Sequence, residues 1–211
     1  MLVGGNTKVT DCGDEPALIY QKTNCKIAVS SNRVEAVKEL ENKVDIIISD
    51  DGLQHYAMGR NLEIVLFNGV ANGFYLPAGG LRESATRLKN VDFVLNDFDK
   101  KIQNINFINA KTFEKKPLNY FKNTEVIALC GIANPERFFD NLQSLRINFE
   151  KKIFPDHCNF TKNDLNYQKP IITTAKDWVK YKNFASENMW YLDIELVIND
   201  DFYKFLTEKI L

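Results

Sequence analysis

Short runs rich in β-branched residues alternate with segments of helical periodicity, and this alternation constrains the fold more than any other feature of the chain. Strand-like runs occupy residues 26–30, 44–49, 62–67, 92–96, 125–130, 171–174 and 190–196. Helical patterns occupy residues 16–22, 33–42, 81–88 and 200–211, and a further one begins at Pro135. Such alternation is typical of βα units around a mostly parallel sheet. The sequence therefore predicts an α/β fold, in which residues 44–49 form a fully buried strand.

Two domains are expected within the 211 residues. Residues 97–123 are rich in Lys and Asn, which predicts weak strands or a connector. We therefore expect one domain over residues 1–110, a connector over 111–123 and a smaller α/β domain over 124–211. In the latter, Asn134 and Pro135 indicate the start of a helix. Thr161 with Asp164 is a variant of the capping box and predicts another helix.

Charge and cysteine content restrict the class of protein. The 27 basic and 28 acidic residues give a formal net charge of −1, so bulk electrostatics does not favour nucleic acid as a partner. The four cysteines are far apart and form no Cys-x-x-Cys pair, which indicates reduced thiols in a cytoplasmic protein. Neither a signal peptide nor an apolar run long enough to span a bilayer is expected.

The hexapeptide Asp-Asp-Gly-Leu-Gln-His at residues 50–55 directly follows the apolar run Ile46–Ile48. Ligands of open α/β sheets bind beyond the carboxyl ends of strands, where these side chains would fall. Neighbouring residues on an extended chain point to opposite sides, so Asp50 and Asp51 are expected to have different roles, one of them binding Mg²⁺. Gly52 would allow a sharp backbone turn. A polar turn that ends a strand would explain the same residues.

Three further features are candidates for chemistry, each with a structural alternative. Asp14 precedes Glu-Pro and an apolar run, so it is either a helix N-cap or a general base. The only histidines, His55 and His157, lie in polar loop sequences, where a histidine without a function is common. The loop at residues 72–83 ends in Arg82 and Glu83 and either covers a site, with Arg82 binding phosphate, or is an ordinary surface loop.

Taken in order, these segments resemble the tetraacyldisaccharide 4'-kinases, the lipid A 4'-kinases of Gram-negative bacteria. The matching segments are residues 13–16, 29–33, 50–55, 60–64, 72–83, 155–157 and 174–177, so the resemblance covers nearly the whole chain. It implies a P-loop-NTPase-like core and transfer of the γ-phosphate of ATP to the 4'-hydroxyl of a lipid A disaccharide precursor, with Mg²⁺. The expected location is the cytoplasmic face of the bacterial inner membrane.

The resemblance also implies roles for individual residues. Asp14 matches the catalytic base, and His157 matches its partner from the second domain. Asp50 and Asp51 match the metal site and, together with Gln54 and His55, the site for the nucleotide phosphates. The residues expected around nucleotide and substrate are Glu15, Arg33, Asn72, Arg82 and Glu83.

The N-terminal portion of the family, with an apolar membrane-associating helix and the phosphate loop Gly-x-x-x-x-Gly-Lys-Thr, has no counterpart in the 211 residues. In P-loop enzymes the backbone amides and the lysine of that loop hold the β- and γ-phosphates. We therefore expect phosphate transfer to be impaired in the shortened chain, and contact with the membrane surface to depend on the absent segment. The alternative is a non-catalytic remnant that binds phosphate, nucleotide or a partner protein.

Overall fold

The computed structural model describes residues 1–67, 69, 73–96 and 99–210, and the chain divides into two compact units. Unit 1 comprises Met1–Ile48 and Asn104–Ile194, and unit 2 comprises Ser49–Gln103 and Glu195–Leu211. The two units therefore alternate along the chain, which differs from the expected succession of domains over residues 1–110 and 124–211. That division into domains stays a prediction.

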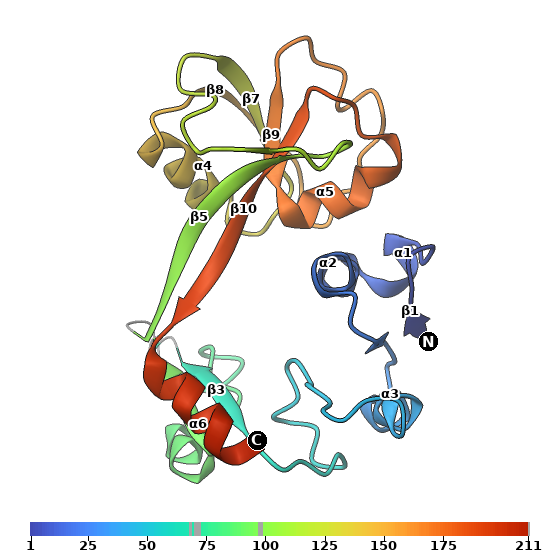
Figure 1. Ribbon diagram of the computed structural model, residues 1–211. Helices are drawn as coiled ribbons and strands as arrows, with labels where there is room; N and C mark the ends of the chain where they lie inside the picture. The colour runs from blue at the N-terminus through green and yellow to red at the C-terminus, as the bar shows by residue number, and fades with distance from the viewer. Residues whose placement is uncertain (68, 70–72, 97–98, 211) are drawn as a thin grey trace. The chain divides into compact units, whose positions relative to one another are not determined.

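A six-stranded, mostly parallel sheet confirms the predicted α/β class (Figure 1). Its order is β6 (Lys115–Lys116), β5 (Lys100–Asn109), β10 (Met189–Ile198), β9 (Ile171–Thr174), β7 (Glu125–Cys130) and β8 (Asn148–Ile153). The strands β10, β9, β7 and β8 are parallel, and β6 is antiparallel to β5. Hydrogen bonds from Ala110 N to Met189 O and from Asn199 N to Asp99 O show that β5 and β10 run antiparallel. Residues 97–123 thus include a ten-residue strand, β5, instead of only weak strands.

Strand β7 is buried on both faces because its side chains alternate between two apolar clusters. Residues 126, 128 and 130 belong to one cluster with Phe139 and Leu142 of α4 (Pro135–Ser144). Residues 127 and 129 belong to the other cluster with Trp178 and Val179 of α5 (Ala175–Tyr181). The helix expected from Pro135 is confirmed, with Asn134 at the N-cap position but without a side-chain capping bond.

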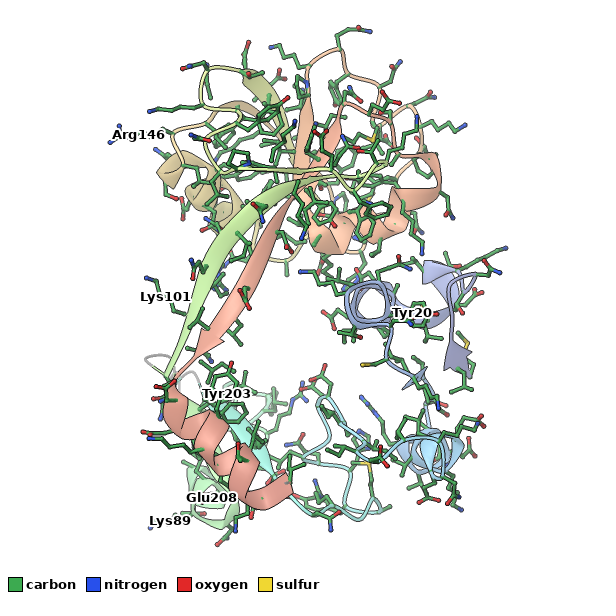
Figure 2. The ribbon with its side chains drawn as sticks, viewed as in Figure 1. Tyr20, Lys89, Lys101, Arg146, Tyr203 and Glu208 are labelled. Carbon is green, nitrogen blue, oxygen red and sulfur yellow. The ribbon has the colours of Figure 1, made fainter. Side chains whose placement is uncertain are left out.

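The first 48 residues add small elements to unit 1. Strand β1 (Leu2–Val3) pairs antiparallel with β2 (Ile27–Ala28), and the helices are α1 (Val9–Cys12), α2 (Asp14–Thr23) and α3 (Arg33–Leu40). Ala17 of α2 is buried in the cluster that contains Trp178, and Tyr20 packs against the same cluster. Figure 2 labels Tyr20 on α2. The helices predicted over residues 16–22 and 33–42 are therefore present, the second one ending at Leu40.

Unit 2 has its own short parallel pair, β3 (Ile64–Phe67) with β4 (Phe93–Asn96). Phe93 of β4 packs against Phe202 and Phe205 of α6 (Asp200–Ile210), with ring centroids 5.4 and 4.8 Å apart. Figure 2 labels Tyr203 and Glu208 on this helix. The helix expected over residues 81–88 is instead a 3₁₀ helix, η1 (Ala85–Asn90).

Two expected elements are absent where the sequence placed them. Residues 44–49 form no strand, and the side chains of Ile46 and Ile48 are 54% and 91% exposed. Within the described ranges no strand pairs with this segment, and an apolar run without a neighbouring strand lacks partners for its backbone groups. Thr161 N and Oγ1 donate to Asp164 Oδ2 at 2.8 and 2.6 Å, but turns follow instead of a helix. Only Leu165 is buried there, so the segment lacks the apolar face that stabilises a helix.

Strand β8 and helix α5 were not expected from the sequence, because β8 contains few apolar residues and α5 has only seven residues. Of the residues that the structure describes, none belongs to a helix long and apolar enough to cross a membrane.

Burial separates the four cysteines by reactivity, which alkylation can test. Cys25 is exposed, whereas Cys130 is buried in the sheet, and desolvation together with the Asp177 charge raises the pKa of the Cys130 thiol to about 12. Burial also raises the pKa of Cys12. Since the thiolate is the nucleophile, iodoacetamide at neutral pH should label Cys25 first and leave Cys130 unlabelled, as measured by peptide mass spectrometry. Labelling of all four thiols in guanidinium is the control, and equal rates for Cys25 and Cys130 in the folded chain would contradict the burial of β7.

Candidate active site

Asp14 opens helix α2 and carries a carboxylate that is buried from water. The N-cap position is taken by Gly13, whose φ of 91° favours glycine, so the interpretation of Asp14 as the N-cap is wrong. The side chain of Asp14 is only 6% exposed, and its Oδ1 accepts a hydrogen bond from Glu15 N at 3.1 Å. A buried carboxylate needs partners for its second oxygen as well.

His157 supplies one of those partners. Its Nδ1 lies 3.1 Å from Asp14 Oδ2, which brings together two residues 143 positions apart in the chain. His157 has a φ of 57°, and its backbone N–H donates to Asp156 Oδ1 at 3.0 Å. The imidazole is 63% exposed. The pair thus combines a buried carboxylate with an imidazole that a ligand from solvent can reach.

Gly131, the residue after β7, allows the histidine loop to lie against the end of that strand. A Cβ at this position would come within 3.0 Å of Pro155 O, and a backbone carbonyl cannot shift cheaply. Phe154 N also donates to Cys130 O at 2.8 Å. The loop that carries His157 is therefore held by the backbone of β7.

An ion pair that sequence reasoning missed lies next to Asp14. The carboxylate of Asp177 is fully buried, and its Oδ2 accepts hydrogen bonds from Thr174 Oγ1 at 2.8 Å and from Gly131 N at 3.0 Å. Its Oδ1 accepts from Lys180 Nζ at 2.9 Å, and the same ammonium lies 3.6 Å from Asp14 Oδ2. The signal in the sequence was Thr174-x-x-Asp177, a helix-capping pattern, with Lys180 one turn later.

Glu15 and Arg33, both expected near the substrate, also belong to unit 1. Glu15 is exposed, and Lys176 Nζ lies 3.4 Å from its Oε1 and 3.9 Å from Asp14 Oδ2. Arg33 is the first residue of α3, where Asn32 caps the helix by accepting from Val34 N at 3.1 Å. Arg33 is partly exposed.

In unit 2, Asp50 and Asp51 are both exposed at the start of a series of turns. The left-handed backbone conformation lies at Asp51, with φ 51°, and not at Gly52. Gly52 is required instead for close approach, because an added Cβ would lie 2.8 Å from Ser49 Oγ and 3.3 Å from Met58 Cε. Among the described residues no group of three or more His, Cys, Asp or Glu side chains is arranged to hold a metal ion.

A network of ion pairs between partly buried side chains holds the turns after Asp51 in place. Glu63 accepts from Arg87 Nη2 at 2.7 and 2.6 Å and lies 3.2 Å from Arg60 Nε. Arg60 Nη1 also donates to the carbonyls of Gly52 and Leu53, each at 3.0 Å. The network therefore joins the residues after Asp51 to strand β3 and helix η1.

The structure brings Gln54 and Glu83 together, since Gln54 Nε2 donates to Glu83 Oε1 at 2.9 Å. Glu83 Oε2 lies 3.5 Å from Arg87 Nε, and its hydrogen bond to Tyr56 raises the pKa of that phenol. His55 and Arg82 are exposed. Asn72 lies outside the described residues.

Replacing Asp177 should test the buried ion pair. Asp177→Ala leaves the Lys180 ammonium buried without its main partner and Gly131 N without its acceptor, so the free energy of unfolding in urea should fall by about 3–5 kcal/mol. Asp201→Ala removes an exposed carboxylate paired with Lys204 at 3.6 Å, and should change stability by about 0.5 kcal/mol or less. Equal effects of the two substitutions would contradict the assignment.

The crowding at Gly52 predicts a second difference. Gly52→Ala should lower the free energy of unfolding by about 1–3 kcal/mol, because the new methyl group overlaps Ser49 Oγ. Gly59→Ala is the matched control, since a Cβ at Gly59 meets nothing within 4 Å. Urea titration of both variants measures the difference, and a Gly52→Ala variant as stable as Gly59→Ala would show that the turn is not tightly packed.

Comparison with known proteins shows the family and the fold of the chain. The family model for tetraacyldisaccharide-1-P 4'-kinase (LpxK) matches residues 1–211. The tetraacyldisaccharide 4'-kinase of Ruthia magnifica is 47% identical over all of this chain, which spans 71% of that relative. The enzyme of the same name from Haemophilus influenzae is 41% identical over 94% of this chain, which spans 64% of it.

A solved structure shows the same fold. The chain of LpxK from Aquifex aeolicus, whose crystal structure is described as a complex with ATP, superposes with a TM-score of 0.81 at 24% identity. The alignment covers 98% of this chain and 71% of the Aquifex chain. The match of the family model along the entire sequence, together with the identity to the Ruthia kinase, shows that the chain belongs to the tetraacyldisaccharide-1-P 4'-kinase family.

Proposed function

We propose that the chain serves in ATP-dependent phosphorylation of the 4'-hydroxyl of a tetraacyldisaccharide 1-phosphate, a lipid A precursor, at the cytoplasmic face of the bacterial inner membrane. The observation that carries the proposal is the Asp14–His157 pair, with 3.1 Å between Oδ2 and Nδ1. A carboxylate oriented by an imidazole suits a general base that takes a proton from a hydroxyl group. Family membership supplies the identity of the hydroxyl and of the phosphate donor.

In this proposal the oxygen of the 4'-hydroxyl bonds to the γ-phosphorus of ATP, and Asp14 accepts the proton that this hydroxyl loses. The bond from that phosphorus to the β,γ-bridging oxygen breaks, and ADP leaves with the electron pair. His157 orients the Asp14 carboxylate through Nδ1 and, being 63% exposed, stands on the side of the pair that an acceptor can approach. Phosphate transfer of this kind depends mostly on positioning, which a rigid pair provides.

Asp50 and Asp51 are proposed to hold Mg²⁺, while Gln54 and His55 contact the nucleotide phosphates. Both aspartates are exposed carboxylates, and Mg²⁺ typically uses one or two carboxylates while keeping several waters. When bound, the ion would neutralise charge on the transferring phosphoryl group. The remaining contacts to nucleotide and substrate are assigned to Glu15, Arg33, Asn72, Arg82 and Glu83.

The chain spans about two thirds of the length of its relatives, 71% and 64% for the two described above. The phosphate loop expected of the family is not recognisable within the 211 residues. We therefore expect the 211-residue chain by itself to transfer phosphate slowly, and a fusion that places the N-terminal segment of a related kinase before Gly4 to transfer it faster. Membrane contact is assigned to that same N-terminal segment.

The test is an assay of phosphate transfer from labelled ATP to the disaccharide acceptor. In the fusion, Asp14→Asn and His157→Ala should each lower kcat by about 100-fold or more, with KM for ATP unchanged, because both act at the reacting hydroxyl. Asp201→Asn, which neutralises a carboxylate that is 78% exposed, is the control and should leave kcat unchanged.

Two results would contradict the proposal. A folded fusion that binds ATP without transferring phosphate would favour a non-catalytic remnant that binds nucleotide, phosphate or a partner protein. Substitutions of Asp14 and His157 that raise KM for ATP at unchanged kcat would show that the pair binds nucleotide and is not the base.

A further inference from the structure

The chemistry proposed above gives no role to Lys180, although its ammonium is the most deeply buried cation near the pair. The side chain is 4% exposed, and a buried charge is costly unless it is paired. Its Nζ lies 2.9 Å from Asp177 Oδ1 and 3.4 Å from Gly131 O, and 5.6 Å from the centre of the Phe160 ring. These contacts fix one side of the ammonium within the protein.

The other side of the same ammonium faces the proposed base. Lys180 Nζ is 3.6 Å from Asp14 Oδ2, the oxygen that also lies 3.1 Å from His157 Nδ1. One carboxylate oxygen is thus placed between an anchored cation and the imidazole. The separation of 3.6 Å is that of an ion pair and not of a good hydrogen bond, so Lys180 acts on Asp14 through charge.

Lys176 is a second cation near Asp14, but it is held differently. Its Nζ lies 3.9 Å from Asp14 Oδ2 and closer, at 3.4 Å, to the exposed carboxylate of Glu15. Its side chain is 24% exposed, compared with 4% for Lys180. Solvent screens a more exposed pair and allows it more rotamers, so Lys176 constrains Asp14 less.

The rigidity of Lys180 comes from Asp177. That carboxylate is itself fixed by Gly131 N at 3.0 Å and by Thr174 Oγ1 at 2.8 Å, so it cannot rotate without losing both hydrogen bonds. The position of Lys180 is therefore fixed by the end of β7 and the start of α5, and Lys180 in turn restrains the Asp14 carboxylate on α2. An error of about 1 Å in placing a reacting group is enough to lower a rate by about 100-fold.

We propose that Lys180 is a positioning residue that holds Asp14 Oδ2 toward His157 and so sets the geometry of the pair. Its effect on phosphate transfer rests on the proposed function, whereas the placement of the two side chains does not. Two measurements separate these parts.

The first measurement needs no activity and uses the 211-residue chain. With only two histidines, the ring nitrogen NMR signals are assigned by His55→Gln. Lys180→Met should change the His157 ring signals, as should Asp14→Asn, and in the Asp14→Asn background Lys180→Met should add no further change. Lys151→Met is the control, because its ammonium pairs with the exposed Glu136 at 2.9 Å and should leave the His157 signals unchanged. If the Lys180→Met variant does not fold, the double variant Lys180→Met with Asp177→Asn, which removes both buried charges together, is measured in its place.

The second measurement is the transfer assay. Lys180→Met should lower kcat by about 10- to 100-fold with KM for ATP unchanged, and Lys180→Arg, which keeps the charge, should recover most of the loss. Lys176→Met should have a smaller effect. In the Asp14→Asn background the Lys180→Met loss should vanish, because the two residues act as one unit.

Unchanged His157 signals in Lys180→Met, a loss equal to that of Lys176→Met, or additive losses with Asp14→Asn would each overturn the inference. Coupled NMR signals in a protein that transfers no phosphate would instead support the positioning of Asp14 and count against the proposed function.

Discussion

The carboxylate of Asp177 is the group on which the site in unit 1 depends. It accepts a hydrogen bond from Thr174, the N-cap residue of helix α5, holds the end of strand β7 through Gly131 N and neutralises Lys180, all without contact with water. A buried carboxylate in a low-dielectric interior stabilises the fold only when each oxygen has a partner, and here both oxygens do. The Lys180 ammonium is paired with both Asp177 and Asp14, so a continuous chain of ion pairs joins the end of strand β7 to the candidate base.

Unit 2 depends on a comparable but more exposed constraint. Glu63 joins Arg60 and Arg87, and Arg60 in turn holds the carbonyls that follow Asp51. Because the pair of strands in this unit is short, such polar links contribute to its order together with the packing of Phe93 on α6. The predicted metal residues Asp50 and Asp51 therefore precede turns that are anchored by Arg60, with their own carboxylates exposed.

Local pattern predicted most of the elements but not all of them. Strand β7 and helix α4 were found because apolar periodicity and a proline at the helix start are properties of the segment itself. Residues 44–49 have the same apolar character but form no strand in the described structure, because a strand also needs a neighbour and no local sequence encodes one. Strand β8 was missed for the opposite reason, since its partner β7 stabilises a segment with little apolar content of its own.

For the candidate site, the sequence by itself determined the residue types, their order and their resemblance to one kinase family, because motifs are properties of the linear chain. Only the tertiary structure decided that the pairing of Asp14 with His157, expected from the resemblance, is a direct contact across 143 positions. It also decided that Gly13 and not Asp14 caps the helix, and that Gly52 avoids Ser49. Only the tertiary structure revealed the role of Lys180, because nothing in the sequence distinguishes this residue from a surface lysine. Burial and pairing give that residue its meaning, and both arise only when distant segments pack together.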